Sequence, residues 1–427
     1  MLSRRQLLKR SGLASAALLT GANAWSETPS SMSPHIRKLT SRRHEVLPIS
    51  PTERLARQQR ARELMASEQL DAILLAEGTS LNYFTGVRWW GSERLTLAVM
   101  PARGQPFFVC PAFEEGRARE QISQGTGSAP VDVHTWEEDA NPYEVLVNAL
   151  RDRELSAGHL GLEESMRFVF SDSLRKALPK AAFSSATPIT AGCRAIKSPH
   201  EIALMRLASE VTHAAYEATY RSLRTGMTSQ EISALTALAH QRLGFVGEAD
   251  LVLIGAYSAF PHGSLTPSRL DKGDIVLMDG GCDVEGYKSD ITRTVVLGTP
   301  TSRMRSIFET VKLAQEAALA TAGPGIACGD VDAAARRVIS EAGFGADYAR
   351  FTHRLGHGIG MDGHEWPYLV RGNRSLLQPG VTTSNEPGIY LPGEFGIRLE
   401  DDMVITDTGA ELLTPRSQSL DDPFART

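Results

Sequence analysis

Four acidic residues and one histidine, each within a short motif, constrain the second half of this chain most strongly. They are Asp279 in LMDGG, Asp290 in KSDITRT, His357 in HRLGHGIG, Glu386 in SNEPGIY and Glu400 in RLEDD. Asp279 ends an apolar run and shares a strand face with Leu277 and Ile275, where an ionised acid needs a cation or a partner. If the five side chains converge, their charge requires about two divalent cations, the arrangement that activates water for hydrolysis. The motifs therefore predict a metal-dependent hydrolase.

The first 24 residues have the three parts of a twin-arginine export signal. A basic run with Arg4 and Arg5 is followed by the apolar stretch 12–20 and by Ala22-Asn23-Ala24, a small-x-small cleavage site. The apolar stretch is far shorter than the roughly 20 residues that a membrane span needs. A basic tail without an export role is the alternative. We expect residues 1–24 to be a signal peptide for the twin-arginine translocon, and the mature protein to reside in a bacterial periplasm.

Composition and charge exclude some partners. The chain has 427 residues, of which 42% are hydrophobic and 22% charged, which is enough for packed cores. Its net charge of −5 becomes about −9 without residues 1–24, which carry four basic side chains and no acid. An acidic protein is a poor partner for nucleic acid or an anionic membrane. We therefore expect neither partner, and no membrane span.

The cysteines do not form a metal-binding pattern. Cys110, Cys193, Cys282 and Cys328 lack both a CxxC pair and zinc-finger spacing. Because twin-arginine cargo folds in the reducing cytoplasm before export, we expect unpaired and mostly buried thiols. Cys282 lies near Asp279, but the oxygen-rich ligand set is complete without it. We therefore expect Cys282 to fill space behind the metal-binding strand and not to be a ligand.

Patterning divides the remaining chain into a leader and two domains. Residues 25–50 are rich in Ser, Pro and Arg without an apolar period, which predicts a flexible leader. Helical segments then alternate with short apolar strands such as 71–76, which predicts a small α/β domain over residues 51–190. Residues 191–427 predict an α+β domain, with helices packed on an antiparallel sheet.

The second domain has clear helix starts and strands. Ser198-Pro199-His200-Glu201 and Thr228-Ser229-Gln230-Glu231 are capping boxes that open two helices. A turn at Val284-Glu285-Gly286 would let Asp279 and Asp290 face each other across a hairpin. Two more helices are expected at about 302–321 and 331–342, and strands at 275–279, 287–297, 388–390 and 398–405.

Histidines complete the candidate site. His353, His357 and His364 are spaced four and seven residues apart, and glycines surround the middle one. Glycine lets the backbone approach closely, so His357 is expected on a tight loop with His364 reaching over the same cleft. His262, in FPHGS, stands just before the first metal-binding strand.

At these residues the chain resembles the pita-bread (M24) metallopeptidases, the family of methionine aminopeptidase, Xaa-Pro aminopeptidase and Xaa-Pro dipeptidase (prolidase), with creatinase as a relative without metal. The resemblance runs from about residue 52 to 415. Asn82-Tyr83-Phe84-Thr85-Gly86 and Ile196-Lys197-Ser198-Pro199 are similar to the N-terminal domain and the linker of the creatinase, prolidase and Xaa-Pro aminopeptidase branch. The resemblance implies a pita-bread catalytic domain, with helices on a curved antiparallel sheet, preceded by a smaller α/β domain of the creatinase/prolidase type. It also implies a homodimer or a dimer of dimers.

The resemblance further implies a role for each candidate residue. Asp279 is the expected ligand of one metal ion, Asp290 and Glu400 are the bridging carboxylates, and His357 and Glu386 are ligands of the second ion. Glu386 is also expected to take the proton of the attacking water. His262 and His364 would contact the substrate and steady the oxyanion, and His353 and Arg398 would line the pocket on the proline side. The oxygen-rich ligand set favours two Mn²⁺ ions, and Co²⁺, Fe²⁺ or Zn²⁺ are compatible.

These roles imply an exported exopeptidase that hydrolyses the X–Pro bond at the N-terminus of small peptides or in dipeptides. The choice between dipeptidase and aminopeptidase stays open. One alternative is a metal-dependent C–N hydrolase or lyase of the creatinase-like fold that acts on a small molecule. Another is an inactive binding module. Creatinase lacks the metal ligands and inactive relatives usually lose some, whereas this chain keeps all five.

Overall fold

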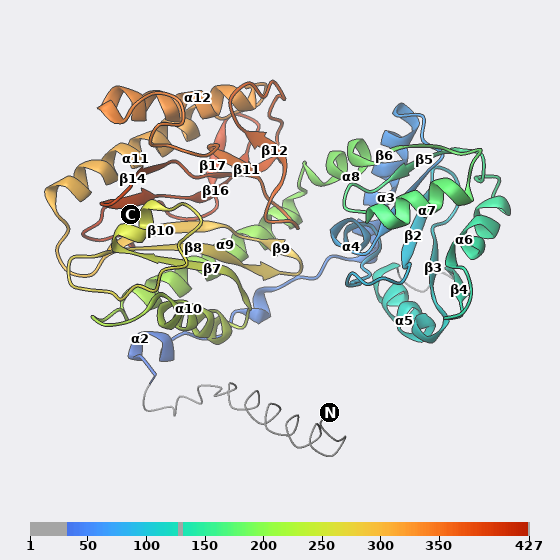
Figure 1. Ribbon diagram of the computed structural model, residues 1–427, viewed down its shortest axis with the longest axis horizontal. Coiled ribbons are helices and arrows are strands. Elements are labelled where there is room, and N and C mark those ends of the chain that lie inside the picture. The colour runs from blue at the N-terminus through green and yellow to red at the C-terminus, as the bar shows by residue number, and fades with distance from the viewer. Residues whose placement is uncertain (1–31, 127–130, 426–427) are drawn as a thin grey trace, which may run out of the picture.

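The protein consists of two lobes that are joined near α8 (Figure 1). The computed structural model describes residues 32–126 and 131–425. The smaller lobe contains the elements from α3 to α8, and the larger lobe contains the rest, including the first described helix. The expected signal peptide, residues 1–24, lies outside the described residues.

The smaller lobe is an α/β domain, as predicted. Its six-stranded sheet has the order β4-β3-β2-β1-β5-β6, in which β1 pairs antiparallel with β2 and parallel with β5. The strands are β1 (Ala72–Ala76), β2 (Leu97–Pro101), β3 (Phe107–Pro111), β4 (Asp132–Trp136), β5 (His159–Leu162) and β6 (Ala182–Ser185). The helices are α3 (Pro51–Ser67), α4 (Thr79–Thr85), α5 (Glu115–Thr126), α6 (Pro142–Arg151), α7 (Phe168–Ala177) and α8 (Thr187–Arg194).

The central strand of this sheet is buried on both faces. Ile73 and Leu75 belong to one hydrophobic core, and Leu74 belongs to the core on the other face, as the alternation of side chains along a strand requires. All five residues of β1 are buried. This explains why the sequence shows a continuous apolar run there rather than an alternating one.

The larger lobe is an α+β domain with three antiparallel sheets. One contains β7 (Gly247–Ile254), β8 (Ile275–Val284), β9 (Tyr287–Lys288) and β10 (Ile291–Val296). A second contains β11 (Gly356–Gly358), β12 (Glu365–Leu369), β13 (Thr382–Asn385), β16 (Asp401–Ile405) and β17 (Ala410–Leu412). The third is the pair β14 (Gly388–Leu391) and β15 (Phe395–Arg398). These strands lie between a helical layer with α9 (Pro199–Tyr220) and α10 (Ser229–Leu243) and another with α11 (Ser302–Thr321) and α12 (Cys328–Ile339), as Figure 1 shows.

Local signals in the sequence account for the helix ends. Both predicted capping boxes are formed: the side chain of Ser198 accepts from the backbone of Glu201, and that of Thr228 accepts from Glu231. Helix α10 ends at Gly244, whose φ of +94° is favourable only for glycine. Among the helices of the described ranges, none has the length and apolar character to cross a bilayer.

Three strand predictions differ from the structure. The strand expected over 287–297 is divided into β9 and β10, with Ser289 and Asp290 between them. The strand expected over 398–405 is interrupted, because β15 ends at Arg398 and β16 begins at Asp401. The strand expected to end at Asp279 continues to Val284. The interruption places Glu400 between two strands that belong to different sheets, where its side chain is free to face a cavity.

The prediction of a flexible leader over residues 25–50 is wrong for its described part, residues 32–50. This segment lies on α9 and α10 of the larger lobe. The side chain of Ile36 is fully buried, Arg42 donates its backbone N–H to the carbonyl of Leu243 over 2.9 Å, and the hydroxyls of Ser33 and Ser222 are 2.6 Å apart. Its apolar residues are too few to show a period in the sequence, although they are sufficient to anchor the segment.

Candidate active site

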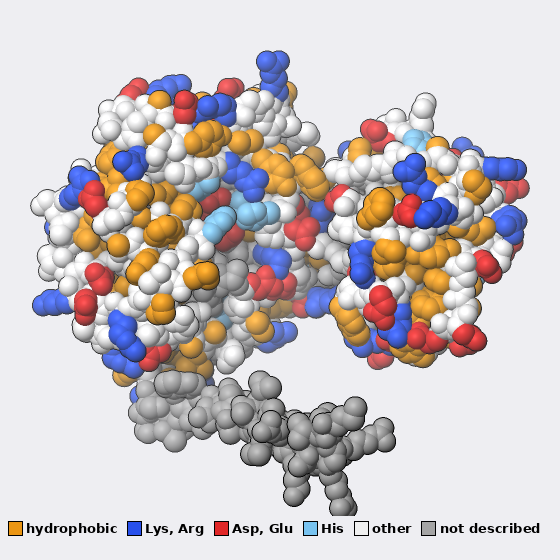
Figure 2. All heavy atoms as spheres, viewed as in Figure 1, with side chains coloured by type: hydrophobic (Ala, Val, Ile, Leu, Met, Phe, Trp, Pro, Cys, Tyr) orange, Lys and Arg blue, Asp and Glu red, His pale blue; other side chains and the backbone are white. Residues whose placement is uncertain are grey.

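All nine predicted site residues line one cavity of about 130 Å³. They are the expected metal ligands Asp279, Asp290, His357, Glu386 and Glu400 and the expected substrate-contacting residues His262, His353, His364 and Arg398. Pro261 and Arg354 complete the lining. Figure 2 shows histidine side chains close to acidic and basic ones on the visible face of the larger lobe.

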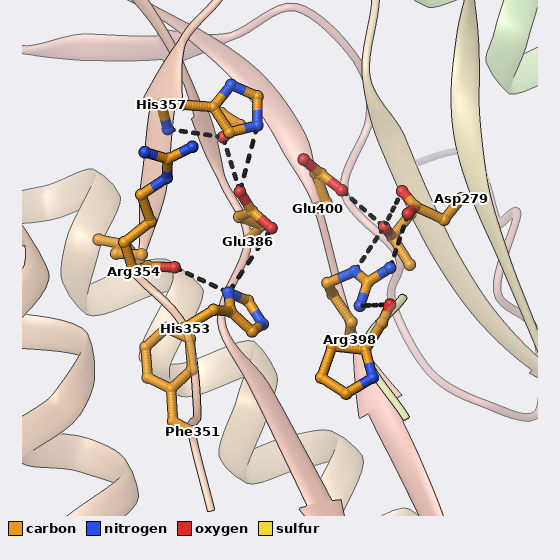
Figure 3. Close-up of polar contacts among 12 residues, drawn as sticks. Asp279, Phe351, His353, Arg354, His357, Glu386, Arg398 and Glu400 are labelled. Carbon is orange, nitrogen blue, oxygen red and sulfur yellow. Dashed lines mark hydrogen bonds and ion pairs between the residues drawn. The ribbon is translucent and has the colours of Figure 1, made fainter. Parts of the chain in front are cut away.

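The five expected ligands lie on, or next to, strands of two sheets. Asp279 lies within β8 opposite Thr292 of β10, and Asp290 comes directly before β10. His357 is the central residue of β11, Glu386 follows β13, and Glu400 precedes β16. We refer to these five side chains as the carboxylate cradle. Figure 3 shows His357 and Glu386 on one side of it, Asp279 on the other, and Glu400 between them.

The ligand atoms of the cradle fall into overlapping groups. Those of Asp279, Asp290 and Glu400 lie within 4.8 Å of one another, and so do those of His357, Glu386 and Glu400. Glu400 therefore belongs to both groups, which is the position of a carboxylate shared by two ions. Carboxylate oxygens with one imidazole nitrogen are suitable ligands for hard or intermediate divalent cations.

Electrostatics show that the cradle lacks positive charge. Burial and then the charge of Asp279 raise the pKa of Asp290 well above its ordinary value, and burial and then Asp290 do the same for Glu400. Burial raises the pKa of Glu386 to about 8, and the neighbouring Asp279 also raises it. These carboxyl groups resist ionising together, so bound cations would relieve a repulsion that the chain itself leaves uncompensated. The donor set therefore fits two divalent ions.

His357 is oriented as a metal ligand. Its Nδ1 lies 3.1 Å from the carbonyl oxygen of Gly358, which can only accept, so Nδ1 carries the proton. Burial lowers the pKa of His357 to about 3, and the ring is therefore neutral with a free lone pair on Nε2. That Nε2 lies 3.3 Å from Oε1 of Glu386 and 3.9 Å from Oδ2 of Asp290. A backbone carbonyl that fixes the imidazole tautomer is typical of metal sites.

A chain of polar contacts crosses the site from His353 to Asp279. The Tyr390 hydroxyl lies 2.7 Å from Nε2 of His353 and accepts from Nη1 of Arg398 over 2.9 Å. Arg398 in turn donates Nη2 to Oδ2 of Asp279 over 2.7 Å. His353 also donates Nδ1 to the carbonyl of Arg354, so both of its ring nitrogens have protein partners. His353 thus lines the cavity, where its Nδ1 also lies 3.8 Å from Oε2 of Glu386 (Figure 3). Tyr390, which links His353 to Arg398, is a residue that sequence reasoning missed.

His364 and Arg354 stand at the exposed side of the cavity. The ring of His364 stacks on that of His357 with centroids 3.7 Å apart. Arg354 donates Nη2 to Nδ1 of His364 over 3.0 Å, and because arginine cannot accept, His364 must carry its own proton on Nε2. Burial and then Arg354 lower the pKa of His364. Its Nε2–H is thereby available to donate to a ligand.

Two further residues support the cradle, and both belong to the motifs of the expected ligands. The hydroxyl of Thr292, in KSDITRT, lies 2.7 Å from Oδ1 of Asp279 and 2.6 Å from Oε2 of Glu400. The carboxylate of Asp402, in RLEDD, accepts the backbone N–H of Asp290 over 2.9 Å. One signal in the sequence was available for Thr292 and Asp402: each is a polar residue two positions from an expected ligand. Their partners lie more than a hundred residues away for two of these contacts, and the sequence alone does not reveal them.

The cysteines take no part in the site. All four are buried and unpaired, as expected. Cys282 directs its Sγ to the backbone carbonyl of Ala208 at 3.4 Å, away from Asp279. It fills space behind the strand.

Comparisons with known proteins agree with the fold. Residues 203–407 match the model of metallopeptidase family M24, and residues 57–196 match that of the creatinase/prolidase N-terminal domain. The protein YkvY of Bacillus subtilis is 37% identical over 341 residues, which are 79% of this chain and 92% of that protein. The chain belongs to metallopeptidase family M24, and its larger lobe has the pita-bread fold.

Two named relatives are similar over most of their length. The Xaa-Pro dipeptidase of Lactobacillus delbrueckii subsp. lactis is 32% identical over 82% of this chain and 94% of its own. The crystal structure of dipeptidase PepE from Mycobacterium ulcerans superposes with a TM-score of 0.80 at 32% identity, covering 87% of this chain and 98% of that one. The chain is thus a metallopeptidase with candidate divalent-metal ligands in place.

Proposed function

We propose that this protein uses two divalent metal ions to hydrolyse the bond between an N-terminal residue and proline. The observation that carries the proposal is that one cavity contains the carboxylate cradle together with His262, His364 and Arg398. Asp279 would hold one ion, His357 and Glu386 the other, and Asp290 and Glu400 would bridge them. Mn²⁺ is proposed because most of the ligand atoms are oxygens; Co²⁺, Fe²⁺ and Zn²⁺ are the alternatives.

The ions would supply Lewis acidity that lowers the pKa of a water molecule towards neutrality. Glu386 would accept the proton of that water, since its carboxylate points into the cavity and its pKa is already raised towards neutral pH. His364 would donate Nε2–H to the oxygen of the substrate carbonyl as negative charge develops on it. His262 lines the same cavity and would contact the substrate peptide group.

Arg398 and the small cavity favour a short substrate. The X–Pro bond has no N–H and carries a fixed ring, so a dedicated pocket is needed to bind it. Arg398 lines the cavity, and its guanidinium would attract the carboxylate on the proline side of the substrate while Nη2 keeps its contact with Asp279. The relative from Lactobacillus delbrueckii is named as an Xaa-Pro dipeptidase, which supports the same substrate class.

A panel of substrates tests this proposal. Purified protein loaded with Mn²⁺ should cleave Ala-Pro, while Ala-Ala should be cleaved at least about a hundredfold more slowly, which corresponds to roughly 2.7 kcal/mol of barrier. Arg398→Ala should reduce cleavage of Ala-Pro more than that of Ala-Pro-Ala, provided that metal content is unchanged. An equal loss on both peptides would remove carboxylate recognition by Arg398. Cleavage of a small C–N substrate in place of any X–Pro peptide would move the protein to another activity within the fold.

We also propose that the protein is exported to the periplasm by the twin-arginine route. The support is the order of basic run, apolar stretch and cleavage site within residues 1–24. Changing both Arg4 and Arg5 to Lys should leave uncleaved protein in the cytoplasm, still active once it is supplied with metal. Normal appearance of cleaved protein in the periplasm would contradict this.

A dimer or a dimer of dimers is proposed from the family resemblance. Light scattering on the purified protein tests it, and a fully active monomer would overturn it.

A further inference from the structure

The segment from Gly360 to Glu365, which carries His364, has side-chain contacts with the N-terminal domain and with the linker between the two domains. At its start, the backbone N–H of Lys288 donates to the carbonyl of Gly360 over 2.8 Å, which is a contact within the larger lobe. The next polar anchors, Asp362 and Glu365, instead bind side chains of the N-terminal domain and of the linker. We refer to residues 360–365 as the His364 segment.

Glu365 is bound by the linker between the two domains. Its Oε1 accepts from Nζ of Lys197 over 2.6 Å, and both side chains are only 2% exposed. The linker is itself fixed, since Lys197 donates its backbone N–H to the carbonyl of Gly380 over 2.8 Å. A Cβ at Gly360 would come within 2.5 Å of Glu365 Oε1 and 2.8 Å of Lys197 Cε, so the segment is packed closely against this ion pair.

Asp362 is bound by the N-terminal domain. Its Oδ2 accepts from Nη1 of Arg194, the last residue of α8, over 2.7 Å. Its Oδ1 accepts from the hydroxyl of Thr79, the first residue of α4. The side chain of Arg194 is 5% exposed and that of Asp362 39%, so the contact joins a buried arginine to a partly exposed aspartate.

His364 has few contacts of its own to fix it. Its side chain is exposed and has the stack on His357 and the hydrogen bond from Arg354. Its position therefore depends on the residues to either side, Asp362 and Glu365. A misplacement of about 1 Å can reduce the rate of a reaction about a hundredfold.

We propose that Asp362 and Glu365 are positioning residues through which the N-terminal domain, by Thr79 and Arg194, and the linker, by Lys197, set the position of His364. The proposal rests on the proposed function in so far as His364 acts on the substrate carbonyl. It gives the N-terminal domain a part in the reaction, although that domain contributes no residue to the cavity of this chain.

Asp362→Asn is the most direct test, because it removes the charge and keeps the shape. Arg194 would still face Glu365 at 3.9 Å and Glu164 at 3.5 Å, so no buried cation is left without a partner. We expect kcat to fall about tenfold, with KM within about twofold and metal content unchanged, because His364 acts on the transition state. Thr79→Val should give a smaller loss in kcat, while Thr79→Ser, which keeps the hydroxyl, should retain it.

Two comparisons separate a positioning effect from a general one. In a His364→Ala background, Asp362→Asn should cause less than about a twofold further loss, because both changes act through the same side chain. Arg88→Met is the control, since it removes another ion pair between the domains, with Glu285 at 3.4 Å, that does not contact the His364 segment. It should leave kcat unchanged.

Hydrogen exchange of the amides in residues 360–365 supplies a readout that needs no substrate. Exchange should be faster in Asp362→Asn and Thr79→Val than in the wild type or Arg88→Met. Faster exchange together with no activity on X–Pro peptides in any variant would keep the positioning inference and reject the proposed function. Unchanged exchange, or losses in kcat that multiply in the double variant, would overturn the inference.

Discussion

Two charged clusters among the described residues, one at the domain junction and one in the carboxylate cradle, differ in how their charge is balanced. At the domain junction, two basic side chains face three acidic ones: Arg194 and Lys197 with Glu164, Asp362 and Glu365. In the carboxylate cradle, four acidic side chains have one basic partner among them, the ion pair of Arg398 with Asp279. The junction is close to neutral, whereas the cradle is not.

The pKa shifts of the two clusters reflect this difference in balance. At the junction, burial opposes the charge of Arg194, but Glu365 and Asp362 raise its pKa above the ordinary value. In the cradle, burial and neighbouring carboxylates together raise the pKa of Asp290 and Glu400. A balanced cluster is complete as the chain builds it and serves to hold structure. An unbalanced one needs cations that the chain does not supply, and this marks it as the functional site.

The largest expected effect is in the cradle. Asp290→Ala should remove a bridge between the two ions, leave less than one metal ion per chain and lower activity at least about a thousandfold, equivalent to about 4 kcal/mol. The measurement is metal analysis together with the rate on Ala-Pro. Asp283→Asn is the control, because Asp283 lies on β8, the strand of Asp279, but does not line the cavity: its Oδ1 accepts the turn N–H of Gly286 and its Oδ2 lies 3.8 Å from Nζ of Lys288. Normal metal content in Asp290→Ala would remove this residue from the site.

Removal of the buried ion pair at the junction should lower the stability of the fold and leave metal binding unchanged. Lys197→Met leaves the carboxylate of Glu365 buried without its 2.6 Å partner and should lower the free energy of unfolding by about 3 kcal/mol. Lys197→Met combined with Glu365→Gln should recover part of that loss, since no charge is then left unpaired. Denaturant unfolding measures both. Metal stoichiometry should stay at the wild-type value, and its loss would show that the two clusters are not separate.

A smaller effect is expected at His240, a buried ionisable group in neither cluster. Burial lowers the pKa of His240 to about 4, from about 6.5 in the unfolded chain. Between these values the unfolded state binds the proton more tightly, so this stabilisation is present above pH 6.5 and is lost as the pH falls towards 4. His240→Asn should therefore lose less stability than the wild type between pH 7 and pH 4.5, by about 2 kcal/mol in unfolding experiments without metal. Equal pH dependence in the two proteins would show that His240 is not neutral in the folded state.

The sequence predicted the parts of the molecule that local chemistry determines. The capping boxes at Ser198 and Thr228 form as expected, and α11 has the predicted bounds. The five candidate ligands were recognisable by their short motifs, and Asp279 also because an ionised acid on the apolar face of a strand needs a cation or a partner. The structure brings all of them to one cavity, while their individual roles stay predictions.

The missed features depend on contacts between distant residues. Strand β11 has only three residues, two of them glycine, so no period marks it. Tyr390 acquires its role by lying between His353 and Arg398, and the ion pair of Lys197 with Glu365 spans 168 residues. Nothing in the sequence shows which of these residues contact one another. Only the fold brings their partners together.

Metal titration of the wild-type protein tests the central claim most directly. Metal-free protein would be titrated with Mn²⁺ while bound metal and the rate on Ala-Pro are measured on the same samples, with Ala-Ala as the reference peptide. The account predicts that about two ions bind per chain, and that cleavage of Ala-Pro appears as they bind. Cleavage of Ala-Pro that proceeds at full rate without bound metal, or saturation with metal that brings no cleavage of X–Pro, would contradict it.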